Sequence, residues 1–163
     1  MAKLDVLTYG FGLATDQGSV GYSTNSLLRV GNHNILIDTG PSSRRPFLVK
    51  ALKAQGLETD DIDIVILTHM HWDHCQNTDL FTNARVLVNP TEIDYARSPN
   101  KWDLAVAAGM ADMMRNMKVE SVSEGDTIVE GVSIIETPGH TKGHMSILVE
   151  INGENVLIAG DAL

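Results

Sequence analysis

The chain has 163 residues, a length that fits one domain, and 43% of them are hydrophobic, which is enough for a buried core. Its 12 basic and 21 acidic residues leave a net charge of −9, which disfavours nucleic acid as a partner. The single cysteine, Cys75, excludes an internal disulfide framework and favours a reducing compartment such as the cytoplasm. The sequence has neither an apolar run of membrane-spanning length nor a signal-peptide pattern after Met1, so we expect no membrane association.

The first part of the chain predicts strands separated by a polar loop. Residues 4–9, 22–30 and 34–37 have strand character, and residues 10–21 are rich in Gly, Ser, Thr and Asp. His33 lies in the turn before the third strand, where we expect it at the surface. This region therefore predicts the antiparallel beginning of a sheet.

A helix and a further strand follow. Residues 46–55 predict a helix that Ser42 or Ser43 caps and that Gly56 ends. Residues 62–67 are apolar except for Asp63, and this short β-branched run is typical of a buried strand. A strand, a helix and a strand in succession indicate a parallel crossover, so the sequence predicts an α/β fold, which some schemes class as α+β.

The second half of the chain predicts two helices and then mostly strands. Residues 91–94 resemble a capping box that begins a helix, and residues 102–117 carry an apolar, methionine-rich stripe at helical spacing. We interpret this stripe as core, with an adaptable binding surface as the alternative. The predicted strands are 85–89, 119–121, 127–130, 132–136, 146–151 and 155–158, the last two joined by a turn at Asn152-Gly153.

The most distinctive stretch is Thr68-His69-Met70-His71-Trp72-Asp73-His74, directly after the buried strand 62–67. His69 and His71 are two residues apart, so they share a face if the backbone is extended, and Asp73 and His74 follow the turn. Imidazole and carboxylate together suit zinc, iron or manganese. The alternative is a solvated histidine-rich loop, but such dense polar groups at the end of an apolar strand are costly unless they bind something.

Other strand ends carry residues of the same kind. His140 and His144 follow the strand 132–136, and Asp161 follows the strand 155–158. His144 could orient a ligand or be a structural histidine, and Asp38, after the strand 34–37, could either orient a ligand histidine or be a satisfied strand-end carboxylate. We expect Cys75 to serve packing and His33 to take no part in metal binding.

These motifs together resemble the metallo-β-lactamase-fold superfamily of metal-dependent hydrolases. The matching residues are the His-x-His-x-Asp-His run from His69 to His74, the Gly-His at His140 and the Gly-Asp at Asp161. The resemblance implies a four-layer αββα sandwich, of which residues 1–163 would form one incomplete domain, the first half and the opening strands of the second. It also implies a further ligand histidine beyond Asp161, so we expect a fragment that could self-associate through its exposed second-half strands.

The resemblance further implies a chemistry. In the family arrangement His69, His71 and His140 hold one metal ion, Asp73 and His74 hold another, and Asp161 bridges the two ions. We expect these ions to be zinc, with iron or manganese as alternatives. A metal-bound hydroxide would then attack a small ester, lactone or thioester, as in the lactonase and glyoxalase II branch, and Asp73 could move a proton. Two alternatives stay open: an iron oxygenase resembling persulfide dioxygenases, which would use His69, His140 and Asp161, and an inactive fragment that lacks the final ligand.

Overall fold

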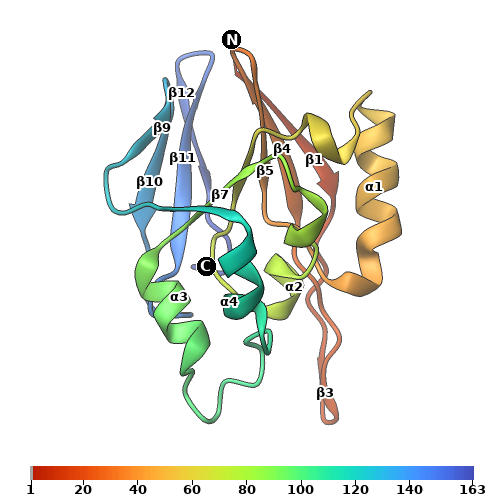
Figure 1. Ribbon diagram of the computed structural model, residues 1–163, viewed down its shortest axis with the longest axis vertical. Coiled ribbons are helices and arrows are strands. Elements are labelled where there is room, and N and C mark those ends of the chain that lie inside the picture. Colours follow the sequence, from red (N-terminus) through yellow and green to blue (C-terminus); the bar gives the residue numbers. More distant parts are fainter. Residues whose placement is uncertain (1) are drawn as a thin grey trace.

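Two sheets form the centre of the molecule in the computed structural model, which describes residues 2–163, with the backbone alone at Ser19. The six-stranded sheet has the order β1 (Lys3–Thr8), β4 (Asn25–Val30), β5 (His33–Ile37), β6 (Ile64–Ile66), β7 (Arg85–Val88) and β8 (Lys118–Ser121). The four-stranded sheet has the order β12 (Glu154–Ile158), β11 (Met145–Ile151), β10 (Val132–Glu136) and β9 (Thr127–Val129). Figure 1 shows the two sheets side by side with helices next to the larger one.

The predicted crossover explains the mixed pairing of the six-stranded sheet. Strands β1, β4 and β5 pair in antiparallel fashion, whereas β5, β6, β7 and β8 are parallel. Helix α1 (Arg45–Ala54) connects β5 to β6 and buries Leu48 and Leu52 against the sheet. Gly56 follows the helix with a φ of +75°, a conformation that glycine adopts without strain. Because parallel strands end at one edge, the loops after β5 and β6 come together there.

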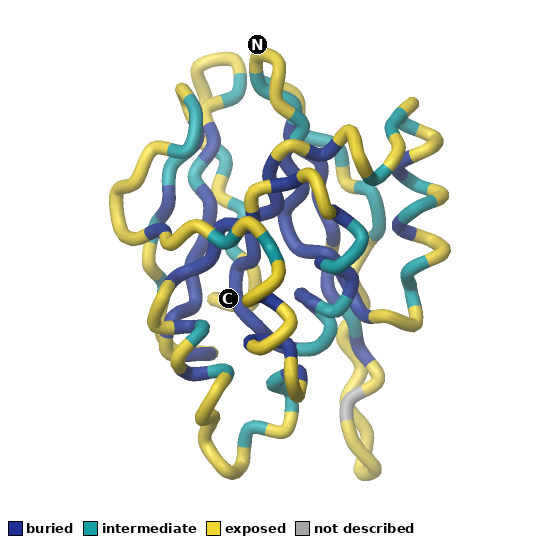
Figure 2. Tube along the Cα trace, in the orientation of Figure 1, coloured by how far each residue is buried: buried dark blue, intermediate teal, exposed yellow. Residues whose placement is uncertain are grey.

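The apolar residues form two buried layers. Figure 2 shows that buried residues lie along the strands of the two sheets. One layer lies between the sheets, where Ile35, Ile64 and Ile66 of the larger sheet meet Ile134 and Ile147 of the smaller one. The other layer packs the opposite face of the larger sheet against helices and includes Leu27, Leu36, Val65 and Val86. Alternate residues of β4, β5 and β6 thus serve opposite layers, which is the period expected for strands buried on both faces.

The smaller sheet is less covered than the larger one. Strand β12 is at its edge, and Leu157 on that strand is half exposed. No helix of the described residues packs on the outer face, so three of the four expected layers are present in this part of the chain. None of the described helices has the length and apolar composition that crossing a bilayer requires.

Three helix predictions need correction. The predicted helix at 102–117 is wrong in its first half: the described helices there are only α4 (Met110–Met113) and a 3₁₀ turn (Met114–Asn116). Gly109, with a φ of +75°, starts α4, and Trp102 is 79% exposed rather than part of a core stripe. The backbone before it pairs elsewhere, because the Trp72 N–H donates to the carbonyl of Ala105. Met110 and Met114 are buried, so the core interpretation holds for these two.

The other two corrections concern helix starts. Helix α3 (Pro90–Arg97) is capped by Asn89, whose side chain accepts a hydrogen bond from the Thr91 N–H, so it begins earlier than the capping-box pattern predicted. Ser42 and Ser43 do not cap α1; they belong to a 3₁₀ turn (Ser42–Arg44) that leads into it. The remaining short elements are α2 (Trp72–Cys75), 3₁₀ turns at Thr59–Asp61 and Thr78–Leu80, and a hairpin of β2 (Ala14–Thr15) and β3 (Gly18–Ser19) within the predicted loop.

Candidate metal centre

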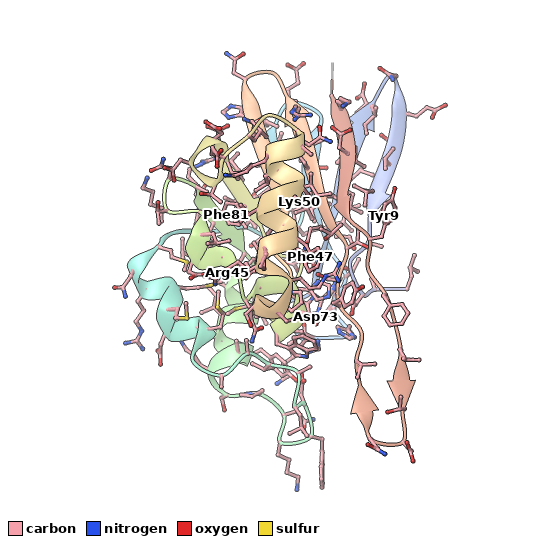
Figure 3. All side chains as sticks on the ribbon, turned by 90° about the vertical axis from the view of Figure 1, so that its right-hand side faces the viewer. Tyr9, Arg45, Phe47, Lys50, Asp73 and Phe81 are labelled. Carbon is pink, nitrogen blue, oxygen red and sulfur yellow. The ribbon has the colours of Figure 1, made fainter. Side chains whose placement is uncertain are left out.

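Three strand ends that carry the predicted site residues meet at one edge of the two sheets. The loop after β6 carries His69, His71, Asp73 and His74, and the loops after β10 and β12 carry the other predicted site residues, His140 and Asp161. Figure 3 places Asp73 beyond the amino-terminal end of α1, on the side from which the β2–β3 hairpin projects. The structure therefore brings together all six candidate ligands predicted from the sequence.

The first group joins His69, His71 and His140, whose ring nitrogens all lie within 4.8 Å of one another. The Nδ1 atom of His71 lies 3.0 Å from the Nε2 atom of His140. His69 is completely buried and His71 nearly so, whereas His140 is exposed at the mouth of the site. Three imidazoles converging in this way are the donor set of many zinc sites.

The second group joins His69, His74 and Asp161. The Nε2 atom of His74 lies 3.3 Å from an oxygen of Asp161 and 3.7 Å from an oxygen of Asp73. Asp161 also reaches the first group, because its other oxygen lies 3.4 Å from Nε2 of His140. Asp161 is thus placed between the two groups, where a carboxylate can bridge two cations.

Neighbouring residues fix the rings of His69 and His74. The Nδ1 atom of His74 lies 2.8 Å from Oδ2 of Asp38, and because a carboxylate only accepts, this nitrogen is the donor. Thr68 donates its hydroxyl hydrogen to Asp38 at 2.9 Å and lies 3.0 Å from Nδ1 of His69. Both rings therefore direct their Nε2 atoms into the site. Of the two interpretations of Asp38, the structure supports the one in which Asp38 orients a candidate ligand, His74.

Asp38 itself has an unusual backbone. Its φ is +56°, and the residue is almost fully buried. Its carboxylate accepts from the backbone N–H of Thr68 at 2.8 Å as well as from the two side chains named above. A non-glycine residue in the left-handed region is held there only when its surroundings fix it, and such residues cluster at functional sites.

His71 is anchored by a residue that sequence reasoning missed. Its Nε2 atom lies 3.2 Å from Oδ2 of Asp103, and Tyr95 donates its hydroxyl hydrogen to the same oxygen at 2.7 Å. Hydrogen bonds from Tyr95 and His71 lower the pKa of Asp103 although its burial opposes this, so Asp103 is a carboxylate at neutral pH. Asp103 lies in the irregular segment that the sequence predicted as helix, and no local signal marks it.

Both ring nitrogens of His144 have hydrogen-bond partners outside the cluster of candidate ligand nitrogens. The Asp161 backbone N–H donates to Nε2 at 3.1 Å, which leaves the hydrogen on Nδ1 to be donated to the Thr137 hydroxyl at 2.8 Å. No lone pair remains for a metal. We conclude that His144 is a structural histidine that holds the loops of Thr137 and Asp161 in place. Cys75 is buried, as expected for a residue that serves packing.

Two buried nitrogens provide the test of whether a metal fits. The Nε2 atoms of His69 and His74 have no hydrogen-bond partner among the described residues, although Nε2 of His74 lies 3.3 Å from a carboxylate oxygen of Asp161. A buried polar atom without a partner costs about 1–3 kcal/mol. Since both atoms point to where the candidate ligands converge, a bound cation satisfies them, and the residues present fit a metal.

The pKa values are lowered for His69 and His140 of the first group and raised for His74 and Asp73. Burial and the neighbouring histidines lower the pKa of His69 far below its ordinary value, so its ring is neutral. Burial likewise lowers the pKa of His140. Burial alone would lower the pKa of His74 too, but the carboxylates of Asp38 and Asp161 raise it to about 10, so a metal bound at Nε2 would have to displace a proton. Burial raises the pKa of Asp73 above the ordinary value of an aspartate.

Two cavities open onto the candidate ligands. One, of about 570 Å³, is lined by candidate ligands of both groups and by the aromatic residues Phe11 and Tyr22. The second, of about 690 Å³, is lined by His71 and His140 together with Trp102 and Lys142. Cavities of this size accommodate small molecules.

Two face-to-face sheets, helices on the outer face of the larger one and a histidine–carboxylate cluster at the strand ends define the metallo-β-lactamase fold class. The comparison with solved structures agrees. A variant of AiiA from Bacillus thuringiensis, with N-decanoyl-L-homoserine bound at its active site, superposes with a TM-score of 0.77 at 23% identity over 96% of this chain and 73% of that one. AidC, a dizinc quorum-quenching lactonase in complex with its product, has a TM-score of 0.70 at 21% identity, over 86% of this chain and 56% of that one.

The chain belongs to the metallo-beta-lactamase superfamily, because the family model matches residues 18–163. A protein of Methanocaldococcus jannaschii named as a probable metallo-hydrolase is 34% identical over 148 residues, which are 88% of this chain and 68% of the relative. An N-acyl homoserine lactonase of Bacillus thuringiensis is 32% identical over 117 residues, which are 71% of this chain and 44% of that enzyme. The chain thus spans about two thirds of the first relative and less than half of the lactonase.

Proposed function

We propose that this chain carries the metal-binding part of a hydrolase that uses two zinc ions to cleave a small ester, lactone or thioester. The observation that carries the proposal is the pair of unpartnered, buried Nε2 atoms of His69 and His74, which face a convergence of further imidazoles and carboxylates. Zinc is the metal of one structural neighbour. The domain, residues 1–163, would correspond to the first half and the opening strands of the complete sandwich.

The candidate ligands divide into two sets. His69, His71 and His140 would hold the first ion, and Asp73 and His74 would hold the second, with Asp161 between them. Zinc bound there would supply Lewis acidity and would lower the pKa of a coordinated water to about 7. Thr68, Asp38 and Asp103 would keep the donor nitrogens turned toward the ions, because each fixes the ring nitrogen that faces away from the site.

Asp73 is the candidate catalytic residue. Its carboxyl group borders the cavity of about 570 Å³ beside Asp161 and His74. Since burial raises the pKa of Asp73, its carboxyl group is suited to take up a proton and to return it to the leaving oxygen or sulfur. The same group would also be a ligand of the second ion.

The substrate class follows from the lactonase relatives and from the cavity. The lining of the cavity of about 570 Å³ includes the aromatic residues Phe11 and Tyr22 as well as candidate ligands. Such a cavity suits a compact ester with an apolar acyl group. We further propose a reducing compartment, the cytoplasm, on the basis of the single cysteine, and self-association through the exposed edge of β12.

The oxygenase alternative would need one iron held by His69, His140 and Asp161. Neither group of converging ligand atoms consists of these three residues, so no observation favours it over the hydrolase. The inactive-fragment alternative predicts metal binding without turnover, so the two measurements below separate it from the hydrolase.

The experiment is metal analysis joined to a substrate panel. Protein freed of metal and then loaded with zinc should bind the ion tightly and hydrolyse an N-acyl lactone or a thioester. His71→Ala should reduce bound zinc and turnover by at least tenfold, whereas the exposed His33→Ala should change neither. Asp73→Ala should lower turnover by about 10²–10⁴-fold, the range of general acid–base catalysis, with the first ion retained. The proposal would be overturned if the protein bound no metal, or if the Asp73→Ala variant hydrolysed the substrate as fast as the wild type.

A further inference from the structure

Glu92 is a buried carboxylate that the proposed chemistry does not use. It lies in the first turn of α3 and is 0% exposed. No lysine, arginine or histidine pairs with it among the described residues. A buried charge needs compensation from charges or hydrogen bonds, so the partners of Glu92 identify its role.

Two backbone N–H groups supply that compensation. Met70 donates to Oε1 at 2.9 Å, and Gly143 donates to Oε2 at 2.9 Å. Met70 stands between His69 and His71, and Gly143 stands between His140 and His144 in the other loop. One carboxylate therefore ties together the two loops that carry the candidate ligands of the first ion.

The glycine at position 143 shows how closely these segments approach. A Cβ atom added to Gly143 would lie 2.2 Å from the backbone nitrogen of Glu92 and 2.7 Å from its Cα atom. Only a residue without a side chain fits there, so the loop of His140 lies directly against the start of α3. The hydrogen bond from Gly143 to Glu92 and the lack of a side chain at Gly143 both allow the His140 loop to approach α3 closely.

We propose that Glu92 is a positioning residue, which sets the separation of the His69–His71 loop from the His140 loop and thereby the affinity of the first metal site. This inference rests on the proposed metal site. A three-histidine site requires its donor atoms at about 2.0–2.1 Å from zinc, so a small shift of one loop against the other weakens binding. Each hydrogen bond to Glu92 acts on the backbone beside the histidines rather than on their rings, so it complements the anchoring by Thr68 and Asp103.

The test compares Glu92→Gln with Asp94→Asn. Both variants exchange a carboxylate for an amide on α3. The side chain of Asp94, however, is 78% exposed, and among the described residues its ion-pair partner is Arg97 on the same helix. The glutamine amide keeps one acceptor and directs an NH₂ group at the other N–H, so the two loops must separate. We expect zinc affinity, measured by competition with a chelating dye, to fall about 10–100-fold in Glu92→Gln and to stay unchanged in Asp94→Asn.

A second readout separates positioning from plain stability. The visible absorption spectrum of the cobalt-loaded protein reports ligand geometry, and it should change in Glu92→Gln but not in Asp94→Asn. In Gly143→Ala, which disturbs the same contact from the other side, zinc affinity should fall as well, and the double variant should lose less than the two effects added together, because both act on one contact.

Four outcomes are decisive. Weaker zinc binding with an altered cobalt spectrum supports the inference. Zinc affinity within twofold of the wild type, with an unchanged cobalt spectrum, overturns it. If Glu92→Gln does not fold, Glu92→Asp, which is one methylene shorter and keeps the charge, should bind zinc with intermediate affinity, and wild-type affinity there would contradict the inference. A wild-type protein without metal affinity would overturn the proposed function itself.

Discussion

Two carboxylate–histidine pairs anchor the candidate metal centre, and they differ in origin. His74 is held by Asp38, which follows β5, the strand next to β6 in the sheet. His71 is held by Asp103, which lies in the irregular segment between α3 and α4. The side chains of the first pair are 3% and 4% exposed, and those of the second pair are 9% and 15% exposed.

The first pair is held by strands of the sheet, and the second pair is held by an irregular segment. Asp38 is fixed by neighbouring strands and accepts three further hydrogen bonds from Thr68. Asp103 is fixed by Tyr95 and by its own loop, where it accepts from the Ala105 N–H. The strand-end pair should therefore contribute to folding as well as to metal binding, whereas the loop pair should contribute to metal binding alone.

The largest expected effect is on the strand-end pair. Asp38→Ala removes the acceptor of Thr68 and of His74 inside the core and places alanine at a φ of +56°. We expect the metal-free protein to lose about 3 kcal/mol of unfolding free energy, the order found when a buried pair is broken. Urea denaturation with a chelator present measures this.

The control for this change is Asp38→Asn, which keeps the shape, tolerates positive φ and can still accept from the Thr68 N–H. Its loss should be clearly smaller than that of the alanine variant. A loss below about 1 kcal/mol in Asp38→Ala would contradict the structural role, since that is the contribution of one ordinary hydrogen bond.

The next effect concerns the loop pair. Asp103→Ala removes the partner of Nε2 of His71. The imidazole ring of His71 can then rotate, and it should bind metal less tightly. We expect zinc affinity to fall about 10–100-fold, as for other partners of ligand histidines. The unfolding free energy of the metal-free protein should fall less than in Asp38→Ala, because this pair is more exposed and Asp103 lies in an irregular segment. Equal losses of stability in Asp103→Ala and Asp38→Ala would remove the distinction between the two pairs.

The smallest effect is expected one step further from the metal. Tyr95→Phe removes the hydroxyl that donates to Asp103 at 2.7 Å and leaves the His71 contact in place. We expect a change in zinc affinity of only a few fold, because one net hydrogen bond contributes about 1 kcal/mol. Isothermal titration calorimetry can resolve this. If Tyr95→Phe weakens zinc binding as much as Asp103→Ala does, then Tyr95, rather than the Asp103 carboxylate, controls the ring of His71.

The sequence by itself determined the features that local patterns encode. The run from His69 to His74 after an apolar strand, together with His140 and Asp161 at other strand ends, predicted the five residues whose ligand atoms converge, and Asp73, which lies 3.7 Å from His74. The resemblance of the combined motifs to the metallo-β-lactamase superfamily implied the ligand set, and the strand ends were readable from short apolar runs. The parallel crossover of α1 was readable for the same reason.

Only the tertiary structure decided the contacts between segments distant in the chain. Glu92 and Asp103 carry no local signal, because an exposed and a buried acidic residue look alike in sequence, and their roles depend on which loops pack against them. The failed helix at 102–117 has the same cause. Its apolar spacing indicated a helix, but in the folded protein Ala105 and Val106 pair with the backbone of the metal loop, and those long-range hydrogen bonds outweigh a weak local preference.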